Sequence, residues 1–433
     1  MKRGLKNRLS SLYQSGELAI RSPIESHCNE AQSKNCLLPF KSSEDSTPYG
    51  KCCYRECEYP LHYYHGNLEL KSLLECCGAD LQVLTKDRSL KNLHPREAFF
   101  FDLESTGLSA GAGTWAFLIG LGWIEQDQFH IRQYFLRNPG EEKAMLYHMA
   151  EKLKQKPSII TFNGKLFDLP LIHSRQILSG LPLSTPSMHL DLLQCARTLW
   201  KRRLPSRSLN AIENNILGLR RENDIQGAEM PNIYFDFIRN GKTDLLPGVL
   251  HHNSLDILSM VTLFARLSAS TRGNIINHPA EEFSLASIYY SNGEERKGLS
   301  IFQTLAASRY EPFNGEAALI AALHYKRKGN WAEAISSWHR ALETTPTAPH
   351  ALLELAKYYE HTEKNFAKAL ELTMNLVNIF KCKENCNYQA QKNYQLRPLA
   401  LEHRVKRLKR RMASAPGMED TNATTKLTDS KTD

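Results

Sequence analysis

Apolar residues in the middle of the chain change their spacing in a way that predicts strands alternating with helices. The runs AFFFDLE, TWAFLIGLGWI and FHIRQYFL are short and rich in aromatic and β-branched residues, which is typical of strands. In EEKAMLYHMAEKLKQ, by contrast, Met145, Met149 and Leu153 recur on one helical face. SIITFNG predicts a fourth strand, and a helix follows over residues 167–178. This order predicts an α/β fold with a mixed sheet flanked by helices.

A different pattern fills the last third of the chain. Tyr290, Tyr325 and Tyr359 recur at intervals of 35 and 34, and a glycine or alanine recurs beside them at intervals of 36 and 35. A period of about 34 residues is that of tetratricopeptide repeats, in which small residues let paired helices approach closely. We therefore expect an all-α solenoid of the tetratricopeptide type, which a last helix with an apolar stripe and a basic face would cap. That basic face is expected to face solvent or to contact nucleic acid.

These patterns divide the chain of 433 residues into four parts. Residues 1–57 have weak periodicity and are expected to form a loosely structured arm. Residues 58–270 are predicted to form the α/β domain, and residues 280–412 the tetratricopeptide-repeat helical domain. Residues 413–433 carry no apolar pattern, and we expect a disordered tail.

Composition and charge describe an ordinary globular protein with a preference for polyanions. The net charge is +9, which favours association with polyanionic partners. No run approaches the ~18 apolar residues that span a bilayer, and the basic N-terminus lacks the apolar core of a secretory signal. We therefore expect a cytoplasmic protein without a membrane partner. Its ten cysteines lack the spacing of a zinc site and are expected to be reduced thiols.

Two acids stand at the end of the aromatic strand FFFDLE. Because residues i and i+2 of a strand point to the same face, Asp102 and Glu104 are expected to project side by side. Two adjacent carboxylates repel each other unless protons or cations neutralise them. Taken alone, the pair would also fit a strand that ends in water.

Two further acids, Asp168 and Asp256, lie in or at the start of apolar helical segments. Asp168 opens the apolar helix that follows TFNG, where the helix dipole by itself favours an acid. Asp256 lies within the apolar helical pattern VLHHNSLDILSMVTLFARL, where an ionisable group needs a partner or solvent. His251 and His252 precede it by five and four residues.

FDLESTGL, TFNGKLFDLP and HHNSLD, in this order, resemble the three exonuclease motifs of the DEDD superfamily of ribonuclease H-like 3′–5′ exonucleases. GLSAGAGTWAFLIGLGW, DLLQCARTLWKRRLPSRSLNAIE and PNIYFDFIRNG resemble more narrowly the bacterial YprB-like branch, which often carries C-terminal tetratricopeptide repeats. The resemblance runs from about Tyr59 through the repeats. It implies a ribonuclease H-like fold in which Asp102, Glu104, Asp168 and Asp256 take the four acidic positions.

The chemistry of these residues agrees with that resemblance. Oxygen ligands suit Mg²⁺ or Mn²⁺ better than zinc. Two such ions about 4 Å apart stabilise both the attacking and the leaving oxygen of a phosphodiester. We therefore expect a two-metal-ion site in which all four acids are metal ligands and catalytic residues.

A histidine near the last acid is expected to activate water, since its side chain ordinarily titrates near neutrality. The superfamily includes one class with histidine five residues before the last acid and another with tyrosine four before it. Within a helix, four residues give about 400° of turn, so His252 shares a face with Asp256 and His251 does not. We choose His252 as the base and keep His251 as the alternative.

Other polar and small residues near the motifs leave two readings open. Asp191 could support the metal site, although we leave it outside the four acids. The basic residues that follow it either contact phosphates or form a solvated face: Lys201, Arg202, Arg203, Arg207, Arg220 and Arg221. The glycines of GLSAGAGTWAFLIGLG are expected to permit tight turns and strand crossings, because no GK[ST] follows them.

The sequence thus predicts a metal-dependent nuclease, a 3′–5′ exonuclease by the resemblance, with DNA or RNA carrying a free 3′ end as its partner. An endonuclease that acts on a structured junction is a second possibility. A third is a tetratricopeptide adaptor that binds nucleic acid or protein without cleavage. The repeats are expected to recruit a protein partner or to organise the path of the substrate.

Overall fold

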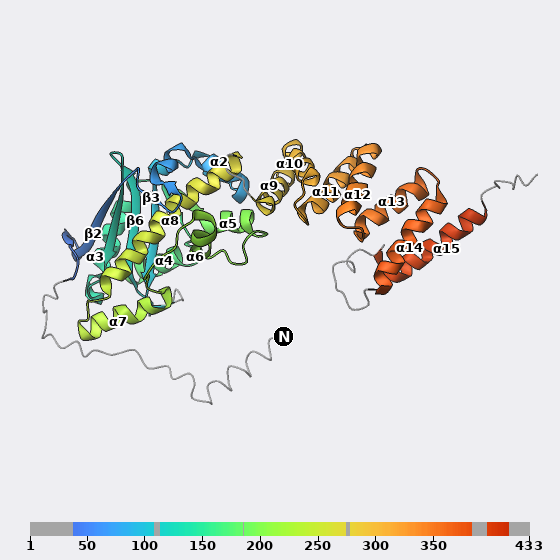
Figure 1. Cartoon of the computed structure of the whole chain (residues 1–433). Coiled ribbons are helices and arrows are strands. Elements are labelled where there is room, and N and C mark those ends of the chain that lie inside the picture. The colour runs from blue at the N-terminus through green and yellow to red at the C-terminus, as the bar shows by residue number, and fades with distance from the viewer. Residues whose placement is uncertain (1–37, 108–112, 185, 274–277, 383–395, 415–433) are drawn as a thin grey trace, which may run out of the picture. The chain divides into compact units, whose positions relative to one another are not determined.

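The computed structural model describes residues 38–107, 113–184, 186–273, 278–382 and 396–414. Seven strands form one mixed sheet in the order β1-β2-β7-β6-β5-β8-β9 (Figure 1). These strands are β1 (Ser43–Thr47), β2 (Gly50–Pro60), β5 (Ala98–Ser105), β6 (Ala116–Glu125), β7 (Gln128–Phe135), β8 (Ser158–Thr161) and β9 (Met188–Asp191). Strands β5, β8 and β9 run parallel, and the other neighbouring strands are antiparallel. The expected mixed sheet is therefore confirmed.

Helices and short turns complete this first part of the chain. The α-helices are α2 (Gly78–Thr85), α3 (Glu142–Leu153), α4 (Asp168–Leu178), α5 (Leu192–Trp200), α6 (Leu209–Ile212), α7 (Met230–Asn240) and α8 (Leu246–Arg272). Short 3-10 segments are η1 (Leu70–Glu75), η2 (Arg88–Asn92), η3 (Pro95–Glu97), η4 (Pro139–Glu141) and η6 (Gly227–Glu229), and η5 (Glu213–Leu217) is a π-helical turn. Strands β3 (Tyr64–His65) and β4 (Leu68–Glu69) form a separate hairpin.

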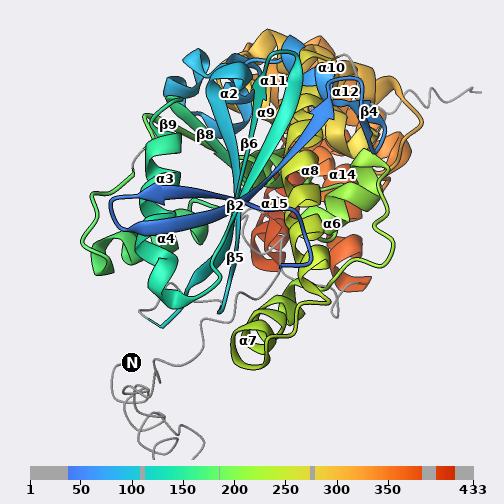
Figure 2. The same cartoon turned by 90° about the vertical axis from the view of Figure 1, so that its left-hand side faces the viewer.

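Helices cover the two faces of the sheet. Helices α3 and α4 lie on one face, and α8 crosses the strands on the other (Figure 2). Strand β6 is buried along nine of its ten residues because both of its faces are covered. A continuous apolar run rather than an alternating pattern is the sequence that such a central strand requires.

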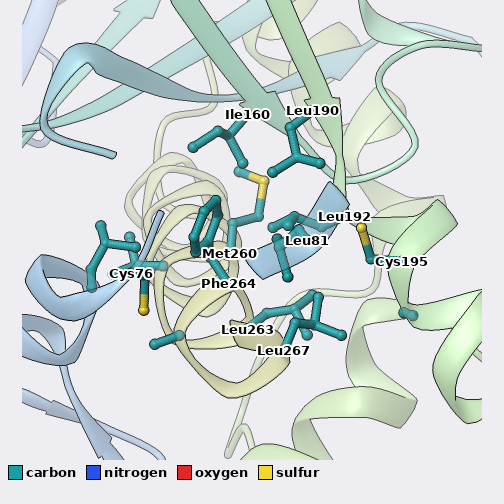
Figure 3. Packing of buried hydrophobic residues seen from close by; sticks show 14 of the residues in the cluster. Cys76, Leu81, Ile160, Leu190, Leu192, Cys195, Met260, Leu263, Phe264 and Leu267 are labelled. Atoms are coloured by element: carbon teal, nitrogen blue, oxygen red, sulfur yellow. The ribbon is translucent and has the colours of Figure 1, made fainter. Parts of the chain in front are cut away.

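Helix α8 is the centre of the main core. Its residues from Ile257 to Leu267 are buried without exception, so this stretch is covered on every side, and most of its residues are apolar. Figure 3 shows Met260 and Phe264 of this helix close to Ile160 of β8 and Leu81 of α2. The first turns of α8 are more polar, and they reach the end of the sheet where the predicted acids lie.

Two glycines of β6 let α8 approach the sheet. A Cβ atom on Gly120 would lie 2.3 Å from Oδ1 of Asn253 and 2.5 Å from Cδ1 of Ile257. A Cβ atom on Gly122 would lie 2.5 Å from Cγ2 of Ile257. These two glycines therefore allow close packing of helix on strand.

The expectation of a loose arm over residues 1–57 is wrong for residues 43–57. Strands β1 and β2 lie there, and β2 pairs with β7 from Tyr54 opposite Tyr134 to Pro60 opposite Gln128. Both strands are half-exposed and rich in charged and small polar residues, so they lack the apolar run by which the inner strands were recognised. Residues 1–37 and the predicted tail from residue 415 lie outside the described residues.

The last third of the chain is helical, as expected. Its helices are α9 (Pro279–Ser291), α10 (Glu295–Ala307), α11 (Phe313–Arg327), α12 (Trp331–Thr344), α13 (Pro349–His361), α14 (Phe366–Cys382) and α15 (Pro398–Ala413). Successive helices pack against each other, and the buried small residues Ala317, Ala334 and Ala351 lie in their shared core. Their assignment as tetratricopeptide repeats stays a prediction.

Helix α9 is joined to the first part by buried contacts. Leu285 and Tyr289 belong to the same apolar cluster as Trp200 of α5. Glu281, which is fully buried, accepts a hydrogen bond of 2.7 Å from Arg203, and Arg266 of α8 lies 3.2 Å from it. The first helix of the helical region is therefore part of the core of the preceding domain.

Cysteine chemistry and membrane insertion can be judged for the described part of the chain. The thiols of Cys52, Cys53, Cys57, Cys76, Cys77 and Cys195 are free there. Within the same residues, every helix falls short of the length or the apolar character that crossing a bilayer requires.

Replacement of Gly120 by alanine tests the close approach of α8 to the sheet. The new methyl group would collide with Asn253, which hydrogen bonds hold in place, so we expect a loss of about 1–3 kcal/mol in the free energy of unfolding. Urea denaturation followed by circular dichroism measures this loss. Gly113→Ala is the control, because nothing lies within 4 Å of its added Cβ. Equal stability of the two variants would contradict the packing described.

Candidate active site

The four predicted acids converge at one end of the sheet. Asp102 and Glu104 lie in the last half of β5, and Asp168 is the first residue of α4, which follows β8. Asp256 comes from the first half of α8, which crosses the sheet beside β5. Strands β5 and β8 are parallel, so their carboxyl ends meet at one edge, where sites of α/β proteins commonly form.

The electrostatics of these carboxyl groups shows that they lie close together. Burial first, and then the charges of Asp256, Glu104 and Asp168, raise the pKa of Asp102 well above its ordinary range. Burial and the charges of Asp256 and Asp168 likewise raise the pKa of Glu104. Burial, with Asp191 and Asp256 nearby, raises the pKa of Asp168 to about 7. Without a cation, the site therefore favours protonated acids.

His252 faces the acids, whereas His251 is exposed. Nε2 of His252 lies 3.9 Å from Oε1 of Glu104 and 3.7 Å from Oδ2 of Asp256. Ligand atoms of these three residues all lie within 4.8 Å of one another, which is close enough to hold one metal ion. The spacing of four residues along α8 thus places His252 beside Asp256.

Asp102 is fixed by a buried amide. Nδ2 of Asn253 donates a hydrogen bond of 2.8 Å to Oδ2 of Asp102. Oδ1 of Asn253 accepts one of 2.9 Å from Gln133 of β7, and Gln133 donates a second, of 2.7 Å, to the carbonyl of Leu250. Asn253 and Gln133 are fully buried, so these hydrogen bonds hold α8 in register with the end of β5 that carries Asp102.

Asp191 supports the loop that presents Asp168. Its carboxylate accepts hydrogen bonds from the backbone amides of Asn163 at 2.8 Å and Lys165 at 3.2 Å, and it caps α5 through Leu193 at 3.1 Å. Asn163 has a φ of 69°, a conformation that asparagine adopts more readily than most residues. Asp191 thus contributes to the site by positioning the loop between β8 and α4.

Arg221 lies among the predicted acids, whereas the sequence analysis expected it to contact phosphates or to face solvent. Its side chain is only 5% exposed, and it forms ion pairs with Asp256, Glu213 and Asp224. Burial opposes its charge, but the carboxylates of Asp256 and Glu213 outweigh burial and raise the pKa of Arg221. This arginine provides the positive charge beside the acids in the described structure. The sequence places it in a run of basic residues, so nothing in that run distinguished it.

Asp224 was also missed, and it orients His252. Its Oδ2 lies 2.8 Å from Nδ1 of His252 and 3.1 Å from the guanidinium of Arg221. Although burial opposes ionisation, the hydrogen bond with His252 and then that with Arg221 lower the pKa of Asp224. A carboxylate at Nδ1 favours the tautomer that carries its proton there, which leaves Nε2 free on the side of Glu104 and Asp256.

Arg202 and Arg203, two of the other basic residues expected to contact phosphates or solvent, pair with acids of the helical region. Arg202 lies 2.6 Å from Glu316, and Arg203 lies 2.7 Å from Glu281. In the described part of the chain, these two guanidinium groups therefore link the segment after α5 to the helical region.

A pocket of about 450 Å³ opens beside the acids. It is lined by Leu103, Glu104, Ser105, Gly107, Phe167, Asp168, Leu171, Gly227, Ala228 and Pro231. Two catalytic candidates, Glu104 and Asp168, thus share the pocket with apolar side chains. Phe167, which is 49% exposed, presents an aromatic ring at this place.

The donor set fits a hard divalent cation. Carboxylate oxygens predominate, as Mg²⁺ and Mn²⁺ require, and the raised pKa values show negative charge that the protein only partly balances. One imidazole nitrogen, that of His252, lies within the same group. Since Arg221 contacts Asp256, a cation bound there would share that carboxylate with the guanidinium.

Comparison with known proteins adds two findings. Residues 99–268 match the model of a family described as the RNase_H superfamily. The chain is 33% identical over 338 residues to the uncharacterised protein YprB of Bacillus subtilis (strain 168). That similarity covers 76% of this chain and 81% of YprB.

The metal-free protein is expected to lose stability as the pH rises. Unfolded carboxyl groups ionise near pH 4, whereas the folded Asp168 ionises near 7, so the stability it contributes below pH 4 is lost as the pH rises through 7. Asp168→Asn removes this loss. In EDTA at pH 8 we expect a melting temperature higher than that of the wild type by roughly 2–4 °C, together with a smaller gain from Mn²⁺.

Differential scanning fluorimetry between pH 4 and 8, with EDTA or Mn²⁺, measures both effects. Asp236→Asn is the matched control, because Asp236 is exposed on α7 and lies outside the three motifs that carry the four acids. Identical pH profiles for Asp168→Asn and wild type would show that burial and the neighbouring acids do not raise the pKa of Asp168 in the folded protein.

Proposed function

Because the chain belongs to the family of Bacillus subtilis YprB and carries a ribonuclease H superfamily domain, we propose that it is a metal-dependent nuclease. More specifically, it hydrolyses phosphodiester bonds of DNA or RNA from a free 3′ end as a DEDD-type exonuclease. The observation that carries this proposal is the convergence of Asp102, Glu104, Asp168 and Asp256 with His252 at one end of the sheet. An adaptor that only binds would need none of these mutually repelling acids.

The four acids are the proposed ligands of two Mg²⁺ or Mn²⁺ ions. Their carboxylates offset the charge of the ions, and the sheet and α8 hold them against their mutual repulsion. When bound, the ions would stabilise the negative charge that develops on the phosphodiester. Asn253 and Asp191 hold Asp102 and the loop of Asp168 in place through the hydrogen bonds described above.

His252 is the proposed general base. Nε2, which faces the acids, accepts a proton from the attacking water, and the imidazole gains a positive charge. Asp224 at Nδ1 keeps the ring oriented and stabilises that charge. Arg221 forms ion pairs with both Asp224 and Asp256. It therefore fixes the position of His252, which Asp224 orients, relative to the carboxylate of Asp256. The exposure of His251 makes it the weaker candidate.

The pocket beside the acids is the proposed position of the terminal nucleotide. Its volume of about 450 Å³ falls in the range of small-molecule sites. Aromatic rings bind unpaired bases by stacking, and Phe167 offers such a ring next to Asp168. A base held there would present its phosphate toward Glu104 and Asp168. The helical region, as tetratricopeptide repeats, would recruit a protein partner or guide the substrate.

Metal-dependent shortening of an end-labelled oligonucleotide tests this function. Wild-type protein with Mn²⁺ should convert 5′-labelled single-stranded DNA or RNA to a ladder that shortens from the 3′ end, and EDTA should stop the reaction. Asp102→Asn should abolish the ladder, and His252→Ala should lower kcat by about 10²–10⁴-fold. Asp236→Asn, on the surface of α7, is the control expected to keep activity.

Three outcomes would contradict the proposal. Lack of metal-dependent products from both nucleic acids would favour an adaptor, and unchanged cleavage by Asp102→Asn would place the activity elsewhere. Cleavage of circular substrates, which have no ends, would identify an endonuclease instead.

Asp224→Ala tests the orientation of His252. We expect kcat to fall by about 10–100-fold with little change in KM or in Mn²⁺ affinity, because the lost contact is to the histidine. The ¹⁵N shifts of His252 should move toward a mixture of tautomers, and Asp224→Asn should restore part of the activity. Asp244→Ala, an exposed acid before α8, is the control. A fall in Mn²⁺ affinity as large as the fall in kcat would contradict this role.

A further inference from the structure

Helix α15 concentrates the excess positive charge of the chain. Its 16 residues carry six lysines and arginines and a single acid, Glu402, so the helix has a net charge of +5. The whole chain of 433 residues has a net charge of +9. More than half of the excess thus lies in one helix, and such clustering is typical of surfaces that bind polyanions.

One side of α15 is anchored by a buried acid of α13. Glu360 is fully buried, and its carboxylate accepts hydrogen bonds from Arg407 at 2.8 and 3.0 Å. Arg404 lies 2.9 Å and Arg411 lies 3.7 Å from the same carboxylate. The hydrogen bond with Arg407 and the charge of Arg404 keep the pKa of Glu360 low although burial opposes this. Glu360 stays ionised and is shared by Arg404, Arg407 and Arg411 of α15. These contacts prevent α15 from turning about its own axis.

The other side of α15 presents lysines and an arginine to solvent. At 100° per residue, Lys406, Lys409 and Arg410 lie within a sector of about 100° on the side opposite the Glu360 anchor. All three are exposed, and no ion pair joins them to an acid of the described residues. Arg407 and Arg411, which bind Glu360, have side chains that are 40% and 44% exposed. They therefore extend the basic surface toward the side that faces Glu360.

We infer that this exposed face of α15, formed by Lys406, Lys409 and Arg410, binds the sugar–phosphate backbone of a nucleic acid. Lys409 and Arg410 each follow Lys406 by about one helical turn, roughly 5 Å, and they diverge from each other by about 100° around the helix, which allows each cation to meet a separate phosphate. Guanidinium groups bind phosphate oxygens through paired N–H donors. The binding depends on charge, so it is independent of base sequence and sensitive to salt.

An acidic protein surface is the competing partner, and the composition of this face argues against it. Protein interfaces rely on aromatic and apolar anchors at their centres. The exposed sector of α15 contains Glu402, Ala413 and one exposed apolar side chain, Leu399, beside the three cations, and it has no aromatic residue. The apolar Leu401 and Leu408 are buried on the opposite side. Long-range charge is therefore the main attraction that this face provides.

Fluorescence anisotropy of a 30-nucleotide fluorescein-labelled single strand tests the inference. The full chain is used in EDTA, so that binding is measured without hydrolysis, over a series of KCl concentrations. Lys406→Gln, Lys409→Gln and Arg410→Gln together should raise Kd by on the order of tenfold at 0.1 M KCl. They should also lower the slope of log Kd against log salt by about 2, as expected for three lost phosphate contacts.

A matched triple variant controls for net charge alone. Lys86→Gln, Arg88→Gln and Lys91→Gln remove three equally exposed cations from the first part of the chain. This control should keep the affinity and the salt slope of the wild type, and unchanged circular dichroism should show that both variants fold. Equal effects of the two variants would overturn the inference, as would displacement of the oligonucleotide by polyglutamate at equal charge concentration. Because EDTA prevents hydrolysis, a failure here leaves the proposed nuclease activity untouched, and an inactive enzyme leaves this test intact.

Discussion

Carboxylates gathered where water only partly reaches them repel one another, and the surrounding structure has to withstand this repulsion. Three of the four acids have pKa values raised by burial and by their neighbours, so the folded chain holds them closer than their charges favour. Covalent neighbours do not impose this closeness, since more than 150 residues separate Asp102 from Asp256. It results from the packing of α8 onto the sheet.

Three of the four acids are held by different partners, which distributes the repulsion over several elements of the domain. Asp102 depends on the buried amides of Asn253 and Gln133, and Asp168 on a loop that Asp191 holds through backbone amides. Asp256 depends on Arg221, from the segment between η5 and η6. Such hydrogen-bonded buried polar groups favour one geometry, because a shift breaks the bonds between them.

The inner part of the fold could be predicted from the sequence because its pattern is unambiguous. Strands β5 to β8 and the helices α3 and α4 are buried and show either apolar runs or helical spacing. Strands β1 and β2, which end one side of the sheet, were not predicted because their half-exposed, polar sequences resemble loops in composition.

The predicted site residues are those that carry a local motif, and the missed ones are those that act across the fold. Asp102, Glu104, Asp168, His252 and Asp256 each lie in a recognisable motif, and the structure brings them together. Arg221 and Asp224 lie in a polar stretch whose periodicity is weak, and their partners are 35 and 28 residues away. The ion-pair partners of such charged residues can be identified only from the tertiary structure.

The position of α9 makes the two regions inseparable at their apparent boundary. Its Leu285 and Tyr289 fill the core of the first domain, and its Glu281 neutralises Arg203 and Arg266 there. A chain cut before α9 would leave apolar surface of α5 and α2 uncovered, and it would remove the carboxylate of Glu281 from Arg203 and Arg266. Two related proteins could therefore exchange their helical regions by recombination only if the breakpoint lay after Ser291, the last residue of α9. In this respect α9 is both the last helix of the α/β domain and the first helix of the stack that follows it.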